Sequence, residues 1–172
     1  MPQFDAIIIG TGQAGPSLAH RLAAAGQRVA IVERHHFGGT CVNTGCTPTK
    51  TLVACAYAAL LARRAGDYGV SVPGPVTVDM RKVKARKDYV LGSANRGVEQ
   101  RLRSNRMITV YQGHARFASR QSVAVGGEAL SAPRTFINVG GRPTVPDIPG
   151  LDQVEYFTNS TRLDVEFLPP HL

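Results

Sequence analysis

The sequence contains no tryptophan, and only three of its 172 residues are cysteines. Three cysteines are too few for the disulfide scaffold of a small secreted protein. No apolar run approaches the ~20 residues of a membrane-spanning helix, and Met1 to Asp5 lacks the basic start of a signal peptide. We therefore expect a cytoplasmic protein without membrane contact. In that reducing compartment, a disulfide is expected to be catalytic rather than structural.

Acidic residues are scarce relative to basic ones, and the formal net charge is +8. An excess of this size suggests nucleic acid as a partner. Much of it lies between residues 79 and 106, where nine Lys or Arg accompany three Asp or Glu. No aromatic stacking pattern or nucleic-acid motif accompanies this segment, so we interpret it as a solvated helix face and expect no nucleic-acid partner. A nucleic-acid-binding protein that uses the basic helix is the competing hypothesis.

Two of the cysteines, Cys41 and Cys46, lie at residues 38–50 in what is expected to be a loop rich in Gly, Asn and Thr. On a regular helix, residues five apart have Cα atoms beyond the ~7 Å limit for a disulfide. Gly45 permits a bend just before Cys46, and a helix is predicted from there to about Arg64. Its N-terminus would stabilise a thiolate or an anionic ring. The spacing suits a disulfide that opens and closes, although two unpaired structural cysteines would also fit.

The first 33 residues follow a strand–turn–helix–strand pattern. Apolar, β-branched runs predict strands at 4–9 and 28–32, with a helix at 16–25 between them. The turn after the first strand reads GTGQAG at 10–15, and Glu33 follows the second strand. This arrangement is the βαβ dinucleotide fingerprint.

Each part of this fingerprint has a physical role. Gly10 permits the tight turn, Gly12 lets the backbone approach a pyrophosphate, and Gly15 allows close helix–strand packing. The helix N-terminus then faces the phosphates. Glu33 is placed to accept hydrogen bonds from ribose hydroxyls. The fingerprint by itself does not separate FAD from NAD.

The rest of the chain predicts one more long helix and a return to the sheet. Asp79 is expected to cap an amphipathic helix that runs to about Arg103, followed by a strand at 107–111. Short strands and turns between 116 and 138 predict an antiparallel meander. The return strand is predicted at 135–139.

Residues 38–50, which read GGTCVNTGCTPTK, closely resemble the motif GGTCxNxGCxP(S/T)K of the flavoprotein disulfide reductases. Glutathione reductase, lipoamide dehydrogenase and mercuric reductase belong to this class I pyridine nucleotide-disulfide oxidoreductase family. Residues 138–150 resemble its second flavin motif, ATGxxPxxPxIPG, with Asn138 and Val139 in place of Ala and Thr. The resemblance implies an α/β fold: a Rossmann-like, three-layer FAD-binding domain with an inserted antiparallel β-meander.

The resemblance implies FAD as the cofactor, because the family places its flavin domain first. A Gly-x-Ala turn in the family touches the adenine through its backbone, although His114 alone would be interpreted as a surface histidine. The cofactor-binding residues expected on this basis are Gly10, Gly12, Gln13, Ala14, Gly15, Glu33, Arg34, Gly39, Thr40, Cys41, Gly45, Cys46, Lys50, His114, Ala115, Val139, Gly140 and Asn159.

The resemblance also implies catalytic roles for Cys41, Cys46 and Lys50. Cys46 corresponds to the flavin-proximal sulfur, Cys41 to the interchange thiol, and Lys50 to a lysine near flavin N5. Electrons would pass from NAD(P)H through FAD to the Cys41–Cys46 disulfide and on to a small-molecule or disulfide substrate. The alternative is a flavin-binding electron-transfer module without its own disulfide chemistry.

Residues 1–172 are expected to form one FAD-binding domain, the N-terminal fragment of a longer reductase. Residues 151–172 would be a linker toward an NAD(P)-binding domain, and the fragment alone would be inactive. The full-length enzyme is expected to be a homodimer. His35 and His36 precede the cysteine segment, but no spacing specifies a Cys/His metal site, and we expect no metal.

Overall fold

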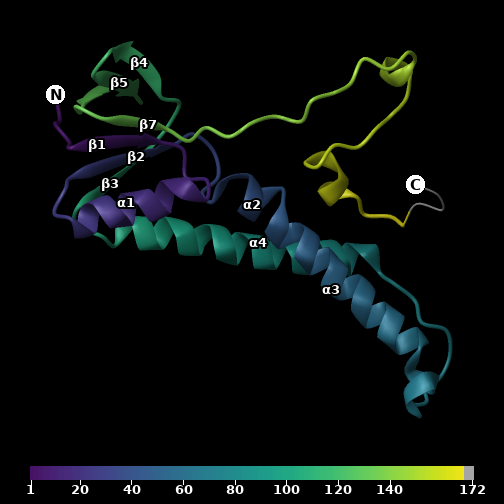
Figure 1. Cartoon of the computed structure of the whole chain (residues 1–172). Coiled ribbons are helices and arrows are strands. Elements are labelled where there is room, and N and C mark those ends of the chain that lie inside the picture. The colour runs from purple at the N-terminus through teal and green to yellow at the C-terminus, as the bar shows by residue number, and fades with distance from the viewer. Residues whose placement is uncertain (169–172) are drawn as a thin grey trace. The chain divides into compact units, whose positions relative to one another are not determined.

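The computed structural model describes residues 1–168, which divide into two compact units. The first unit contains residues 1–43 and 93–142, and the second contains 44–92 together with the described residues from 143 onward. Figure 1 shows the elements of both units in chain order. Each unit is described by itself, and the last four residues of the predicted linker, 169–172, lie outside the described residues.

Four short parallel strands form the central sheet of the first unit, in the order β3-β2-β1-β7. Ile8 of β1 pairs with Ile31 of β2 on one side and Phe136 of β7 on the other. All of β2 is buried, as expected for a central strand covered on both faces. The strands are β1 (Ala6–Ile9), β2 (Val29–Glu33), β3 (Ile108–Gln112) and β7 (Thr135–Ile137).

All four predicted strands of this sheet are present, and two of them are shorter than predicted. Residues 4 and 5 precede β1, where the amides of Phe4 and Asp5 donate to Ser131 and Arg28. β7 ends at Ile137 because its partner β1 ends at the paired residue Ile9.

Helices cover one face of this sheet. The helix α1 (Ala14–Ala24) begins two residues earlier than predicted, and α4 (Met80–Arg103) matches its predicted extent. The C-terminal part of α4 belongs to the first unit and runs alongside α1 in Figure 1. Apolar residues from both helices and three strands form a continuous core: Ile8, Ala19, Ala23, Val29, Ile31, Phe37, Val98, Leu102 and Ile108.

An antiparallel sheet covers the other face. Its strands are β4 (Arg116–Ser119), β5 (Ser122–Val125) and β6 (Glu128–Ser131), in the order β4-β5-β6. Residues from both sheets and from the segment after β6 form a second core between them: Ile7, Ala30, Val32, Val123, Val125, Leu130 and Ala132. The first unit therefore has three layers (helices, parallel sheet and meander), which confirms the predicted Rossmann-like fold.

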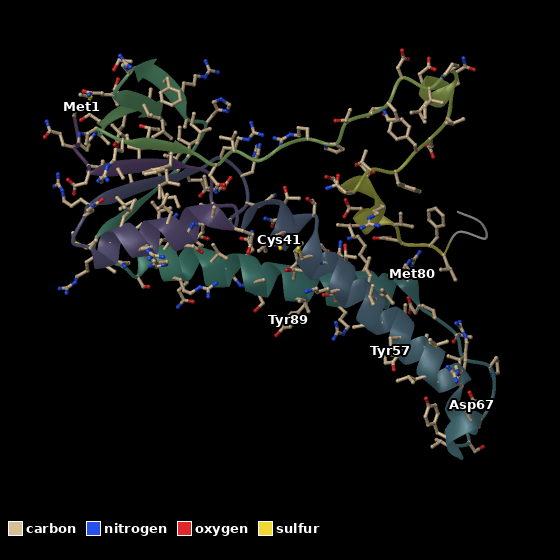
Figure 2. All side chains as sticks on the ribbon, in the orientation of Figure 1. Met1, Cys41, Tyr57, Asp67, Met80 and Tyr89 are labelled. Atoms are coloured by element: carbon tan, nitrogen blue, oxygen red, sulfur yellow. The ribbon has the colours of Figure 1, made fainter. Side chains whose placement is uncertain are left out.

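The second unit is built from α3 (Cys46–Arg63), the first part of α4 and three short 3-10 helices. The predicted cap of α4 is present, because Asp79 Oδ1 accepts hydrogen bonds from the amides of Arg81 at 3.1 Å and Lys82 at 3.2 Å. Tyr57 on α3 and Tyr89 on α4 project from their helices in Figure 2 and are mostly exposed. The 3-10 helices are η1 (Ala65–Tyr68), η2 (Leu151–Gln153) and η3 (Thr161–Asp164).

A buried lysine joins α4 to η3 within this unit. Lys87 is only 2% exposed, and its ammonium donates to the carbonyl of Leu163 at 2.7 Å. It also lies 2.8 Å from Asp88 Oδ1, and Lys84 contacts Asp88 Oδ2 at 2.9 Å. Burial raises the pKa of Asp88, but hydrogen bonds from both lysines and their charges outweigh burial and leave that pKa lowered.

The lowered pKa of Asp88 predicts a loss of stability in acid. The unfolded chain takes up this proton at a higher pH than the folded protein, from its ordinary value of 3.8. The contribution is therefore complete above that value and disappears as the pH falls through the lower folded pKa. Urea unfolding between about pH 2 and 6 should show this loss in the wild type and a smaller one in Asp88→Asn. Equal pH dependence of the unfolding free energy in the two proteins would contradict the assignment.

Glycines allow the turn between β1 and α1 to pack tightly against the segment that follows β7. Gly10 has φ +103°, and a Cβ there would lie 2.2 Å from the carbonyl oxygen of Asn138. A Cβ on Gly15 would lie 2.3 Å from the carbonyl oxygen of Gly10. A Cβ on Gly12 would have Asn138 Nδ2 as its nearest neighbour, at 3.4 Å, which is an ordinary van der Waals distance. Gly10 and Gly15 therefore serve packing, whereas Gly12 leaves space beside its backbone.

This difference predicts opposite outcomes for two alanine substitutions. Gly15→Ala should destabilise the protein by about 1–3 kcal/mol or more, because its methyl group overlaps a backbone oxygen. Gly12→Ala should change the unfolding free energy by less than about 1 kcal/mol, because its methyl group meets no backbone atom. Chemical denaturation followed by circular dichroism measures both. A Gly12→Ala loss as large as that of Gly15→Ala would show that the space beside Gly12 is not available.

Candidate functional site

The predicted site residues fall in both units. Gly45, Cys46, Lys50 and Asn159 belong to the second unit, and all the others belong to the first. In the first unit, the parallel strands direct the segments that follow them to one edge of the sheet, which is where ligands bind in open α/β folds. The structure thus gathers residues from distant parts of the sequence at the carboxyl edge.

Glu33 ends β2 at this edge, and its carboxylate is held by donors from the protein itself. It is 8% exposed. Its Oε2 accepts hydrogen bonds from the amide of Thr11 at 3.0 Å and the hydroxyl of Thr11 at 2.5 Å, and its Oε1 accepts one from the amide of His35 at 2.9 Å. A carboxylate offers about four acceptor positions. About one position therefore remains for a ribose hydroxyl, the ligand that the sequence predicts for Glu33.

Thr11 is a site residue that the sequence analysis missed. It is completely buried, and its hydroxyl also accepts a hydrogen bond from the amide of Gly38 at 3.2 Å. The only signal in the sequence was a hydroxyl residue at a variable position of the glycine turn. Its partners, Glu33 and Gly38, lie 22 and 27 residues away and could not be assigned from the turn itself.

The two glycines that open the cysteine segment pack against this turn and against their own helix. Gly39 has φ +61°, and a Cβ there would lie 2.6 Å from the Cα of Gly12. A Cβ on Gly38 would lie 2.6 Å from Val42 Cβ. The sequence placed Gly39 near the cofactor by resemblance, and the structure shows that it lies directly on the glycine turn.

Asn138 closes the turn from the opposite side. Its amide nitrogen Nδ2 donates to the carbonyls of Gly10 at 3.3 Å and Gly12 at 3.4 Å. The sequence analysis noted Asn138 only as a departure from the usual second flavin motif. The structure shows that its side chain holds the turn together across 128 residues of sequence.

The N-terminus of α1 begins within the same turn and has no side-chain cap. Gln13 precedes the helix without a capping hydrogen bond, and the first turn carries no acidic residue. The first amides of a helix without a side-chain cap, together with its positive dipole end, favour an anion. Gln13 and Ala14 are both exposed. This N-terminus, the space beside Gly12 and the remaining acceptor position of Glu33 fit a phosphate-linked ribose.

Cys41 lies on α2 (Gly39–Asn43), a five-residue helix within the segment expected to be a loop (Figure 2). The side chain of Asn43 explains this turn of helix, because its amide donates to the carbonyls of Gly39 and Phe37, each at 2.9 Å. Asn95 from α4 donates to Phe37 as well, at 2.7 Å. These contacts fix the backbone on both sides of Cys41, which is itself half-buried.

In the second unit, Cys46 is the first residue of α3 and is exposed. Gly45 precedes it with non-helical dihedral angles and without a capping side chain. Lys50 lies one turn further along the helix and is also exposed. The side-chain amide nitrogen Nδ2 of Asn159 donates to the backbone carbonyl of Thr44 at 3.5 Å. Within this unit, predicted residues from the cysteine segment and from the C-terminal segment are therefore neighbours.

Of the remaining predicted residues, Thr40 is exposed on α2, and the rest follow the ends of β2, β3 and β7. The amide of Gly113 donates to the carbonyl of Glu33 at 2.8 Å, which ties the turn after β3 to the end of β2. Ala115 in this turn packs against the second core. The others are exposed: Arg34, His114, Val139 and Gly140.

Within residues 1–168, no group of three or more His, Cys, Asp or Glu side chains is arranged to hold a metal ion. In the same part of the chain, no helix is long and apolar enough to cross a membrane.

The chain is similar to a dehydrogenase and to reductases of known sequence or structure. A dihydrolipoyl dehydrogenase of Acholeplasma laidlawii is 36% identical over 88% of this chain, and a mercuric reductase of Shigella flexneri is 36% identical over 96%. The HOCl-induced flavoprotein disulfide reductase RclA of Escherichia coli, solved as a Cu(II) complex, matches 98% of the chain with a TM-score of 0.78 and 32% identity. The chain spans 45%, 30% and 36% of these three proteins, respectively.

The family model for pyridine nucleotide-disulphide oxidoreductases matches residues 4–171, which is nearly the whole chain. This match agrees with the three-layer fold, the glycine turn at the carboxyl edge of the sheet and the cysteine segment that packs against it. The chain therefore belongs to the pyridine nucleotide-disulphide oxidoreductase family.

Proposed function

We propose that the chain is the FAD-binding and disulfide-carrying part of an NAD(P)H-dependent flavoprotein oxidoreductase. The observation that carries the proposal is the packing of Gly39, in the cysteine segment, against Gly12 of the nucleotide turn. This contact brings α2, which carries Cys41, next to the predicted cofactor loop in one unit. A nucleotide module unrelated to thiol chemistry would not need that juxtaposition.

The chain's own groups supply what an adenine dinucleotide requires. The uncapped start of α1 offers amides to a pyrophosphate, and the space beside Gly12 admits it closely. Glu33 accepts a hydrogen bond from the ribose. Bound FAD would supply two-electron transfer between a reduced nicotinamide and a disulfide. The remaining residues of the proposed FAD site follow β3 and β7: His114, Ala115, Val139 and Gly140.

Cys41 and Cys46 are proposed to form the redox-active disulfide. Reduction adds two electrons and two protons, breaks the S–S bond and leaves two thiols. Transfer of the electron pair to a substrate, with release of the two protons, re-forms that bond. Cys46 lies exposed at the start of α3, one turn before Lys50, so its sulfur is accessible for pairing. Lys50 is proposed to place its charge near the reduced ring.

The substrate of the whole protein is proposed to be a small molecule or a disulfide. The relatives are named for mercuric ion and dihydrolipoyl groups, and RclA was solved with Cu(II). We propose that the intact protein is a cytoplasmic homodimer without a nucleic-acid or membrane partner. Residues 1–172 alone are proposed to be inactive toward NAD(P)H, because their glycine turn is proposed to bind FAD rather than a nicotinamide cofactor.

The first test is cofactor binding. FAD should bind the purified chain, and Gly12→Trp should weaken binding by at least about tenfold, because the indole fills the space beside the turn. FMN, which lacks the adenosine and the pyrophosphate, should bind poorly to both proteins. Flavin fluorescence during titration measures each affinity, and Leu61→Trp at an exposed position of α3 serves as the control. Equal FAD affinity in the wild type and Gly12→Trp would reject the assigned site.

The second test is cysteine pairing. Mild oxidation with diamide, which accepts two electrons and two protons, should link Cys41 to Cys46 and leave Cys55 as a thiol. Peptide mapping by mass spectrometry should find this bond in the wild type and in Cys55→Ser. Neither Cys41→Ser nor Cys46→Ser should form it. FAD binding without this disulfide would favour the alternative, a flavin-binding electron-transfer module without its own disulfide chemistry.

A further inference from the structure

We propose that Thr11 is a positioning residue that sets how the site recognises the ribose and links that recognition to the cysteine segment. The inference rests on the proposed nucleotide site and deepens it. Its basis is the pair of contacts made by one buried hydroxyl: donation to Glu33 Oε2 at 2.5 Å and acceptance from the amide of Gly38 at 3.2 Å.

The hydrogen-bond inventory defines what this hydroxyl does. A threonine hydroxyl has a single proton, and an ionised carboxylate can only accept, so the proton points to Glu33. The lone pairs of the oxygen are then available to Gly38. The Thr11 hydroxyl therefore links Glu33, which ends β2, to Gly38, which opens the cysteine segment, through two hydrogen bonds.

Thr11 also determines the direction in which Glu33 can accept a further hydrogen bond. Two of the three internal donors to the carboxylate come from Thr11, its amide and its hydroxyl, and both are directed at Oε2. The third, from the amide of His35, reaches Oε1. The position that remains free is therefore on Oε1. A carboxylate held in this way is preorganised for one ribose hydroxyl and loses little rotamer freedom on binding.

The same hydroxyl holds Gly38 beside the turn, where Gly39 packs against Gly12. Loss of the hydroxyl would leave the buried amide of Gly38 without this acceptor and the buried Glu33 with one donor fewer. Unsatisfied buried polar groups destabilise the arrangement that contains them. The structure thus assigns Thr11 two linked effects: it supports ribose recognition, and it secures the start of the cysteine segment.

The experiment uses ADP, which contains the ribose and pyrophosphate but no flavin. The wild type should bind ADP about tenfold more tightly than whichever analogue, 2′-deoxy-ADP or 3′-deoxy-ADP, lacks the contacting hydroxyl. Thr11→Val, nearly isosteric but without the hydroxyl, should reduce this ratio to about twofold. Thr11→Ser, which keeps the hydroxyl, should preserve it. Isothermal titration calorimetry measures all the affinities.

The ratio of affinities separates positioning from general damage, because a merely destabilised protein would bind ADP and its analogues equally less well. The inference would be overturned if Thr11→Val kept the wild-type ratio of ADP affinity to analogue affinity. It would also be overturned if Thr11→Ser lowered this ratio as much as Thr11→Val does. In either case, ADP binding by the wild type would still uphold the nucleotide site. A wild type that binds ADP but does not discriminate would overturn it too. A wild type that binds neither ADP nor FAD would reject the proposed function together with the inference.

A measurement without ligand tests the second effect. In the wild type, the amide of Gly38 should exchange with deuterium at least about tenfold more slowly than an exposed loop amide, because it is buried and hydrogen-bonded. Thr11→Val should lose this protection, whereas the amides of β2 should keep theirs. Rapid exchange of Gly38 in the wild type would overturn the proposed link, even if Thr11→Val could not be purified in a folded form.

Discussion

A carboxylate that must be satisfied inside the protein is the constraint on which the nucleotide edge of this structure depends. Glu33 ends a fully buried strand, and burial of an unpaired charge would be too costly for a small domain. The protein meets this requirement with two groups of Thr11 and the amide of His35. The glycine turn and the residues after β2 are thereby drawn to the same acid, and the cysteine segment begins next to both.

The three layers make that convergence possible. The parallel sheet is covered by helices on one face and by the meander on the other, so its central strands are largely apolar and end at a common edge. The segments that follow the strands therefore begin close to one another and contact each other directly. Small residues allow the closest approaches, as at Gly39 against Gly12, and the amide of Asn138 binds the carbonyls that the turn exposes.

The second unit depends on a different balance of forces. Lys87 is buried, and its ammonium group is stabilised by a backbone carbonyl of η3 and by the carboxylate of Asp88. Lys87 is buried whereas Asp88 is exposed, and the pair contributes geometry more than net stability, because desolvation of the lysine offsets much of the attraction. It fastens the segment around Leu163 to α4 in the same unit that carries Cys46 and Lys50.

By itself, the sequence determined the order and type of the strands and of the helices α1, α3 and α4, because short-range patterns specify them, whereas α2 and the 3-10 helices were not predicted. Apolar β-branched runs marked the strands, glycines marked the nucleotide turn, and Asp79 marked the start of α4. The candidate site residues came from the glycine fingerprint and from family resemblance. Only the tertiary structure decided that Thr11 satisfies Glu33, that Asn138 binds the turn, and that Lys87 is buried. These contacts join residues far apart in the chain, and each polar group could equally have been satisfied by water until packing excluded it.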